Sequence, residues 1–125
     1  KVSVQEKGFF EYDGVTYASF IVTPKIAAKG LSIRYVLKPT FGKYLHAASG
    51  SGWGAKRTML LPDGKTTLGW FSTLWTGNEE KGLCLFSETR WNWTAEVKQT
   101  YEIEKTPEGL AVTVNIAAAL ASASA

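Results

Sequence analysis

The chain has 125 residues, of which 45% are hydrophobic and 20% charged, a composition that predicts one globular domain and argues against disorder. Its net charge of +3 is scattered, with Lys56-Arg57 as the only adjacent basic pair, so no basic stripe for nucleic acid is visible. No apolar run approaches the roughly 18–20 residues that span a bilayer. We therefore expect neither nucleic acid nor a membrane as a partner.

The single cysteine, Cys84, cannot form an internal disulfide. It stands in the apolar run 83–86, where we expect it to be a small buried hydrophobic side chain. A sandwich of this size can fold without disulfides, so their absence does not exclude export. No basic-then-apolar signal peptide opens the chain, which begins on strand-like sequence, as an excised domain or a mature product would.

Turn signals recur at short intervals along the chain, which is the pattern of an all-β protein. Asp13-Gly14 separates the apolar runs 9–12 and 15–22 and suits a tight hairpin, because Asp-Gly accepts the positive φ angles of such a turn. Residues 31–37 begin with alternating apolar and polar side chains, which indicates a strand with one buried face, and Pro39 ends it.

Between residues 40 and 67 the alternation disappears, and we expect an irregular connection. Residues 41–46 fit either a short helical turn or a strand. Residues 49–54 contain three glycines and are flexible by composition. A connection this long inside a small domain is more often functional or mobile than merely connective.

Regular structure is expected again over residues 68–75, 83–88, 94–104 and 110–116, with a hairpin turn at 106–109. Roughly eight strands joined by hairpins favour two packed antiparallel sheets. We predict an all-β, jelly-roll-like sandwich that forms a single module over residues 1–116. The tail, residues 117–125, contains only Ala, Ser and Leu, and we interpret it as a frayed terminus or as a cloning or linker remnant.

Residues that could carry catalysis are sparse. Both aspartates, Asp13 and Asp63, precede glycines in turns, and Glu79-Glu80 lies in a charged turn where adjacent side chains point apart. The only histidine, His46, has neither a Gly-x-Ser-x-Gly elbow nor converging metal ligands to work with. We expect solvated carboxylates and a loop or half-buried histidine, for which a binding role is the alternative. We expect no catalytic residue, metal or cofactor.

The tryptophans are the remaining signal, because five in 125 residues is a high share. Trp70 and Trp75 flank an expected strand, and their spacing places them on opposite faces, one in the core and one partly exposed. Trp91 and Trp93 share one face if the chain is extended there. Trp53 lies in the glycine-rich segment.

Aromatic faces beside amide and guanidinium donors suit sugar rings, because the C–H face of a sugar stacks while its hydroxyl groups are bound at the edge. The predicted ligand-binding residues are therefore Trp53, Arg90, Trp91, Asn92 and Trp93. The alternative is that these rings seal one end of the sandwich as a satellite of the core.

One dense motif resembles a known family. Residues 75–88, with Gly77-Asn-Glu-Glu-Lys-Gly-Leu83 at their centre, and the following Trp91-Asn92 resemble a segment of the β-sandwich domain in bacterial proteins similar to glycoside hydrolase family 123. Looser matches in the same order extend the resemblance over roughly residues 9 to 116. The chain departs from the pattern at Leu85, where an aromatic residue is common, and at Thr89-Arg90, where an acidic residue is usual.

The resemblance implies an accessory domain and transfers no catalytic residue. In such proteins the hydrolysis of glycosides containing N-acetylgalactosamine is assigned to a separate barrel domain with an Asp-Glu pair, which no part of this chain matches. The leading hypothesis is a non-catalytic module, secreted, periplasmic or on the cell surface, that binds polysaccharide or oligosaccharide by aromatic stacking. The alternatives are a structural domain that packs on a missing catalytic barrel without a ligand of its own, and an enzyme in its own right.

Overall fold

The computed structural model describes residues 2–11, 14–48, 56–87 and 99–121. The chain divides into two compact units, one of residues 1–30 with 119–125 and one of residues 31–118. Each unit is described below by itself. The prediction that residues 1–116 form a single module stays a prediction.

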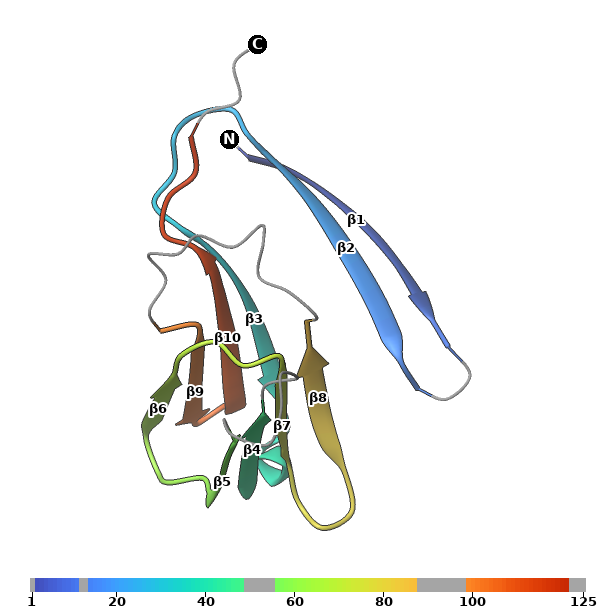
Figure 1. Ribbon diagram of the computed structural model, residues 1–125, viewed down its shortest axis with the longest axis vertical. Helices are drawn as coiled ribbons and strands as arrows, with labels where there is room; N and C mark the ends of the chain where they lie inside the picture. Colours follow the sequence, from blue (N-terminus) through green and yellow to red (C-terminus); the bar gives the residue numbers. More distant parts are fainter. Residues whose placement is uncertain (1, 12–13, 49–55, 88–98, 122–125) are drawn as a thin grey trace. The chain divides into compact units, whose positions relative to one another are not determined.

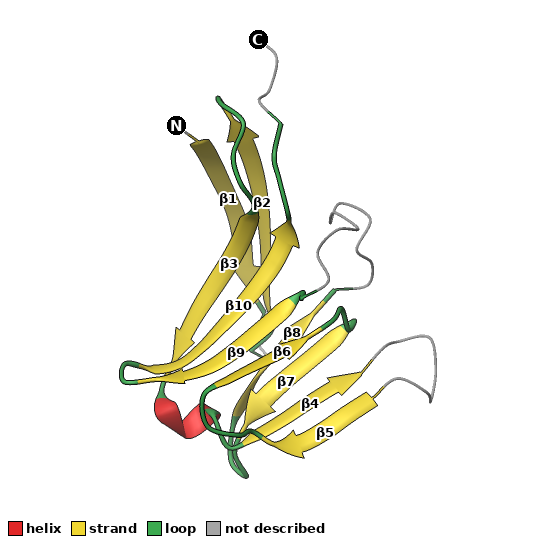
Figure 2. Ribbon diagram, turned by 90° about the vertical axis from the view of Figure 1, so that its left-hand side faces the viewer, coloured by secondary structure: helices red, strands yellow, loops and turns green. Residues whose placement is uncertain are grey.

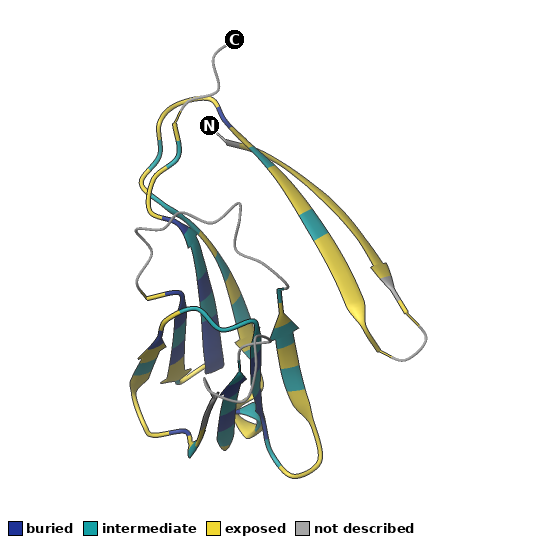
Figure 3. Ribbon diagram, viewed as in Figure 1, coloured by how far each residue is buried: buried dark blue, intermediate teal, exposed yellow. Residues whose placement is uncertain are grey.

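The first unit contains a hairpin of two antiparallel strands, β1 (Val2–Phe10) and β2 (Thr16–Pro24) (Figure 1). Gly14 lies in their connection at a φ of 88°, a conformation that favours glycine, as the Asp-Gly signal predicts. The described side chains of the hairpin are mostly exposed (Figure 3). They include Phe9 and Tyr17, whose rings stack with centroids 5.3 Å apart.

The second unit consists of two four-stranded antiparallel sheets (Figures 1 and 2). The first sheet has the strand order β3-β10-β9-β6, and the second has the order β5-β4-β7-β8. A short 3-10 helix, η1 (Pro39–Phe41), connects β3 to β4. The strands are β3 (Leu31–Leu37), β4 (Tyr44–Ala48), β5 (Lys56–Leu60), β6 (Lys65–Leu68), β7 (Thr73–Gly77), β8 (Gly82–Phe86), β9 (Tyr101–Thr106) and β10 (Gly109–Ala117).

One apolar core joins the two sheets. The second sheet contributes residues such as Leu45 and Leu74, and the first contributes residues such as Ile103 and Val112, all at most 1% exposed. Because side chains alternate along a strand, every second residue of β4 is buried and its neighbours face outward. The buried Tyr101 hydroxyl donates a hydrogen bond of 2.7 Å to the Phe71 carbonyl oxygen. The all-β, two-sheet sandwich is therefore confirmed, and the described residues form eight strands in its two sheets and two more in the hairpin.

The expectation of an irregular connection over residues 40–67 is wrong for the described part of this stretch, although the helical turn or strand considered for residues 41–46 is found. This stretch contains η1, β4, β5 and the start of β6. The inward residues of β4 are Leu45 and the small Ala47, and His46 lies between them, so the hydrophobic alternation is weak in the sequence although both inward residues are fully buried. Tertiary packing has decided the structure where the local pattern is faint.

Two further boundaries differ from the prediction. The expected strand 68–75 is interrupted, because β6 ends at Leu68 in the first sheet and β7 begins at Thr73 in the second. The start of the tail also takes part in backbone pairing, since Ala28 and Leu120 exchange hydrogen bonds of 3.0 and 2.9 Å within the first unit. Connections that cross between sheets leave no clear mark in hydrophobic periodicity.

Gly109 offers a test of the sandwich, because it begins β10 at a φ of 145° and a Cβ there would lie 2.1 Å from the Leu37 carbonyl oxygen. We expect Gly109→Ala to lower the free energy of unfolding by more than about 2 kcal/mol, through backbone strain and displacement of β3. The matched control is Gly64→Ala, which has a φ of 81° but open space around its Cβ and should cost about 1 kcal/mol. Chemical denaturation measures both, and equal losses would contradict the expected clash.

Candidate functional site

The outer face of the second sheet carries the most distinctive group of described side chains. Leu45, Ala47 and Leu74 point into the core, so the residues between them along β4 and β7 face away from it. Cross-strand pairing places these outward positions in adjacent rows. We call the following eight residues the outer patch: Thr58, His46, Trp75 and Cys84 in one row, and Leu60, Tyr44, Gly77 and Gly82 in the next.

The indole of Trp75 lies over the two glycines of the outer patch. A Cβ at Gly82 would come within 2.4 Å of two indole atoms, Cε2 and Nε1, and a Cβ at Gly77 within 2.6 Å of a third, Cζ2. The ring thus occupies the space that two side chains would otherwise fill, with one face against the backbone of β7 and β8. Trp75 is half-buried, so part of the residue remains accessible to solvent.

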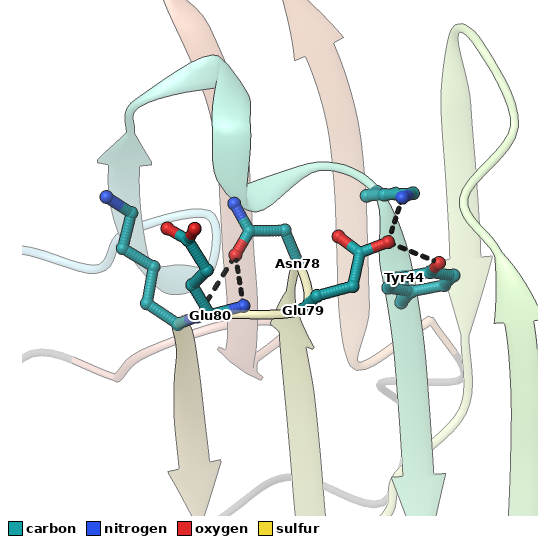
Figure 4. A network of polar contacts seen from close by, with 6 residues as sticks. Tyr44, Asn78, Glu79 and Glu80 are labelled. Atoms are coloured by element: carbon teal, nitrogen blue, oxygen red, sulfur yellow. Dashed lines mark hydrogen bonds and ion pairs between the residues drawn. The ribbon is translucent and has the colours of Figure 1, made fainter.

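The turn between β7 and β8 has a defined shape. The side-chain oxygen of Asn78 accepts hydrogen bonds from the backbone N–H groups of Glu80 and Lys81, at 2.9 and 3.0 Å (Figure 4). The backbone N–H of Asn78 also donates to the Lys81 carbonyl oxygen at 2.9 Å. An asparagine that bonds to the backbone beyond it in this way stabilises a tight turn. The turn fixes the position from which Glu79 extends towards β4.

The Glu79 carboxylate is held by two donors. Its Oε1 atom accepts a hydrogen bond of 2.9 Å from the Tyr44 hydroxyl, and it also pairs with the Lys43 amine (Figure 4). The bond from Lys43, with smaller contributions from a backbone hydrogen bond of Glu79 and from Tyr44, lowers the pKa of Glu79 to about 2, and the same pairing raises the pKa of Lys43. The carboxylate is therefore ionised at neutral pH and acts as a hydrogen-bond acceptor, not as a proton donor. Because both side chains are about half exposed, the pair contributes little to stability.

His46 and Cys84 complete the row of Trp75. The Nδ1 atom of His46 lies 2.6 Å from the Thr58 hydroxyl oxygen, and the residue is half-buried in β4, one of the two environments expected for it. The prediction that Cys84 is a buried hydrophobic side chain is wrong, because the residue is exposed. The reason is that Leu83 and Leu85 are the inward positions of β8, which leaves Cys84 on the outer face.

The two tryptophans near β7 do not flank one strand as expected. Trp70 lies in the connection between β6 and β7, and only Trp75 is part of a strand. Both are half-buried. Trp75 is not among the ligand-binding residues predicted from the sequence. A tryptophan two positions before a glycine, with a second glycine across a tight turn, is the signal that could have identified it.

All five predicted ligand-binding residues lie outside the described residues, so their binding role stays a prediction. They are Trp53, Arg90, Trp91, Asn92 and Trp93. The described residues that precede their segments lie together. Ser72 donates from its hydroxyl to the Ala48 carbonyl oxygen at 3.1 Å, and Ser87 donates from its backbone N–H to the Ser72 carbonyl oxygen at 2.8 Å. Ala48 and Ser87, the last described residues before these two segments, thus lie at the same end of the second sheet.

Comparisons with protein-family models, with curated proteins and with solved structures found no match to this chain. Among the residues that the structure describes, no three His, Cys, Asp or Glu side chains gather closely enough to hold a metal ion. The described helical content also includes no segment of the length and apolarity needed to cross a membrane. The outer patch is therefore described by its geometry and not by similarity to a known site.

The contact between Trp75 and Gly82 can be measured by a double-mutant cycle. We expect Gly82→Ala to lower the free energy of unfolding, because the three atoms nearest to the added Cβ all belong to the indole and the ring must move. In a Trp75→Ala background the same substitution should cost less, by about 1–3 kcal/mol. Chemical denaturation of the four proteins gives the coupling, and strictly additive effects would show that the ring does not rest on Gly82.

The Lys43–Glu79 pair predicts an unusual titration. The pKa of Glu79 is lowered from 4.5 to about 2, so the contact is present above the ordinary pKa of a glutamate and is lost only as the pH falls through about 2. We expect the side-chain carboxyl resonance of Glu79 to titrate near pH 2 in an NMR experiment. In Lys43→Met its midpoint should rise towards the ordinary value, whereas Lys81→Met, on the same turn, serves as the control and should leave it low. A wild-type midpoint near 4.5 would contradict the pairing.

Proposed function

We propose that this chain is a non-catalytic carbohydrate-binding or accessory β-sandwich module of a carbohydrate-active protein, and that it stacks a sugar ring on Trp75. The observation that carries the proposal is the indole, which rests on two glycines and remains partly accessible to solvent. A sugar needs such an apolar platform for its C–H face. The ring is held in place before the ligand arrives, so little side-chain entropy is lost on binding.

Hydrogen-bonding groups surround this platform. On the side of the β7–β8 turn, the Glu79 carboxylate can accept bonds from sugar hydroxyl groups, and Tyr44 and Lys43 hold it in position. In the row of Trp75, His46 and Thr58 add a second polar pair. A few well-placed polar groups next to an aromatic face are the usual composition of a sugar site.

The predicted residues Trp53, Trp91 and Trp93, with Arg90 and Asn92 as polar contacts, are proposed to extend this surface. In support, Ala48 and Ser87, the last described residues before the two segments that contain them, lie at the same end of the sheet that carries the outer patch. The resemblance to the β-sandwich domain of proteins similar to glycoside hydrolase family 123 agrees with this proposal. It adds the expectations of a bacterial origin, a location outside the cytoplasm and a catalytic domain as a partner in the parent chain.

One observation favours the alternative, a structural domain without a ligand of its own. The β1–β2 hairpin exposes several large apolar side chains, among them Phe9, Tyr17 and Ile21 on one face, each more than half exposed. A two-stranded sheet is at best marginally stable alone in water, and exposed apolar side chains that lie together mark surfaces that other protein covers. A catalytic barrel of the parent protein would cover such a surface.

Affinity electrophoresis tests the proposed function. Native gels containing xylan, galactomannan, barley β-glucan, pectic galactan or mucin should retard the wild-type protein in at least one case. We expect Trp75→Ala to weaken that binding by about 10-fold or more, because a central stacking residue contributes at least about 1.4 kcal/mol. The matched control is Tyr17→Ala, which removes an exposed aromatic side chain from the hairpin and should leave the retardation unchanged.

The outcomes of this experiment distinguish binding at Trp75 from binding at the predicted tryptophans and from a structural role without a ligand. Retardation that survives in Trp75→Ala but disappears in a Trp91→Ala/Trp93→Ala double variant would move the site to the predicted tryptophans. Retardation by no glycan, together with self-association of the isolated chain in light scattering, would favour the structural alternative. Circular dichroism of each variant confirms that a loss of binding is not a loss of folding.

A further inference from the structure

A hollow opens at the end of the sandwich beside the outer patch. Its volume is about 630 Å³, within the range of about 300–1,000 Å³ that ligand pockets occupy. Its lining comes from the η1–β4 connection, the end of β5, the β7–β8 turn and β9. The lining residues that matter here are Lys43, Leu60, Asn78, Glu79 and Lys105. We call this hollow the end groove.

The end groove is continuous with the outer patch. Leu60 belongs to both, and Glu79, which lines the groove, accepts the hydrogen bond from Tyr44 of the patch. Leu60 lies on β5 and Trp75 on β7, with β4 between them. Neighbouring strands are about 4.8 Å apart, so the two residues are separated by about 10 Å across the sheet, which is more than one sugar ring can span.

The charges around the end groove cancel. The Lys43 amine pairs with Glu79, and the Lys105 amine lies 3.1 Å from the Asp63 carboxylate and 2.9 Å from the Leu61 carbonyl oxygen. Each of the two cations thus has its own carboxylate. The paired groups still offer N–H donors and carboxylate acceptors for hydroxyl groups, but no excess positive charge is left to favour an anion.

We propose that the end groove is a second sugar subsite and that the outer patch and the groove together take a neutral oligosaccharide of at least two residues. This inference rests on the proposed function. One residue stacks on Trp75, and the chain passes over Tyr44 so that a later residue lies against Leu60 in the groove. The Leu60 side chain, 67% exposed, provides an apolar contact for the C–H face, and Glu79 and Lys105 bind hydroxyl groups.

Isothermal titration calorimetry with ligands of increasing length tests this subsite. The probes are the mono-, di- and tetrasaccharides of the β-1,4-glucan, xylan, mannan and galactan series, with tetragalacturonate as an acidic comparison. In the series that binds, we expect the tetrasaccharide to bind at least about 10-fold more tightly than the monosaccharide, because only the longer ligand reaches both subsites. Tetragalacturonate should bind no more tightly than the neutral tetrasaccharide.

Two variants test whether the gain in affinity with ligand length comes from the end groove. Leu60→Ala and Lys105→Gln should each remove most of the length-dependent gain while leaving the affinity for the monosaccharide within about 2-fold. Trp75→Ala should weaken the binding of every length. The matched control is Val36→Ala, which removes an aliphatic side chain of similar exposure from β3 in the other sheet and should change nothing.

The possible failures are distinguishable. Equal affinity for monosaccharide and tetrasaccharide overturns the second subsite but leaves the proposed function intact, as does an unchanged length dependence in both groove variants. Tighter binding of tetragalacturonate overturns the preference for a neutral ligand. If the wild-type protein binds no probe of any series and is retarded by no glycan, both the proposed function and the second subsite are ruled out.

Discussion

The apolar contact between the inner faces of the two four-stranded sheets is the interaction on which the rest of the structure depends. Leu45 and Leu74 of the second sheet and Ile103 and Val112 of the first are almost completely removed from water. Burial of each such side chain contributes roughly 1.5–3 kcal/mol. Because side chains alternate along a strand, turning these residues inward also turns Trp75 and its neighbours outward. The core thus determines which residues are available for function.

In the outer patch, two glycines leave room for one aromatic ring. Gly77 and Gly82 have no side chains, and the indole of Trp75 occupies the space this leaves on the sheet. The turn between the two glycines carries Glu79, whose carboxylate is oriented by donors from the start of β4. An aromatic ring beside an oriented acceptor that is ionised at neutral pH is more suited to binding than to proton transfer.

The sequence supported the all-β sandwich and the hairpin turns at Asp13-Gly14 and residues 106–109, because Gly-containing turns between strand-like runs have local causes. It failed where the cause was not local. The strand β4 has a weak hydrophobic pattern, and the exposure of Cys84 depends on Leu83 and Leu85 being the residues of β8 that face the core. The aromatic richness of the chain was recognised, but the role of Trp75 was not, because its partner Gly82 lies across a turn.

By itself, the sequence determined the fold class, the main turns and the scarcity of groups for acid–base chemistry, since these follow from composition and from residues close together in the chain. Only the tertiary structure decided how the candidate site is assembled. Lys43 and Glu79 are 36 positions apart, and the Trp75–Gly82 contact and the hydrogen bonds that link Ala48 through Ser72 to Ser87 also require particular strand partners. The order and register of strands arise from packing over the whole sandwich, so no local pattern in the sequence specifies which outward residues meet.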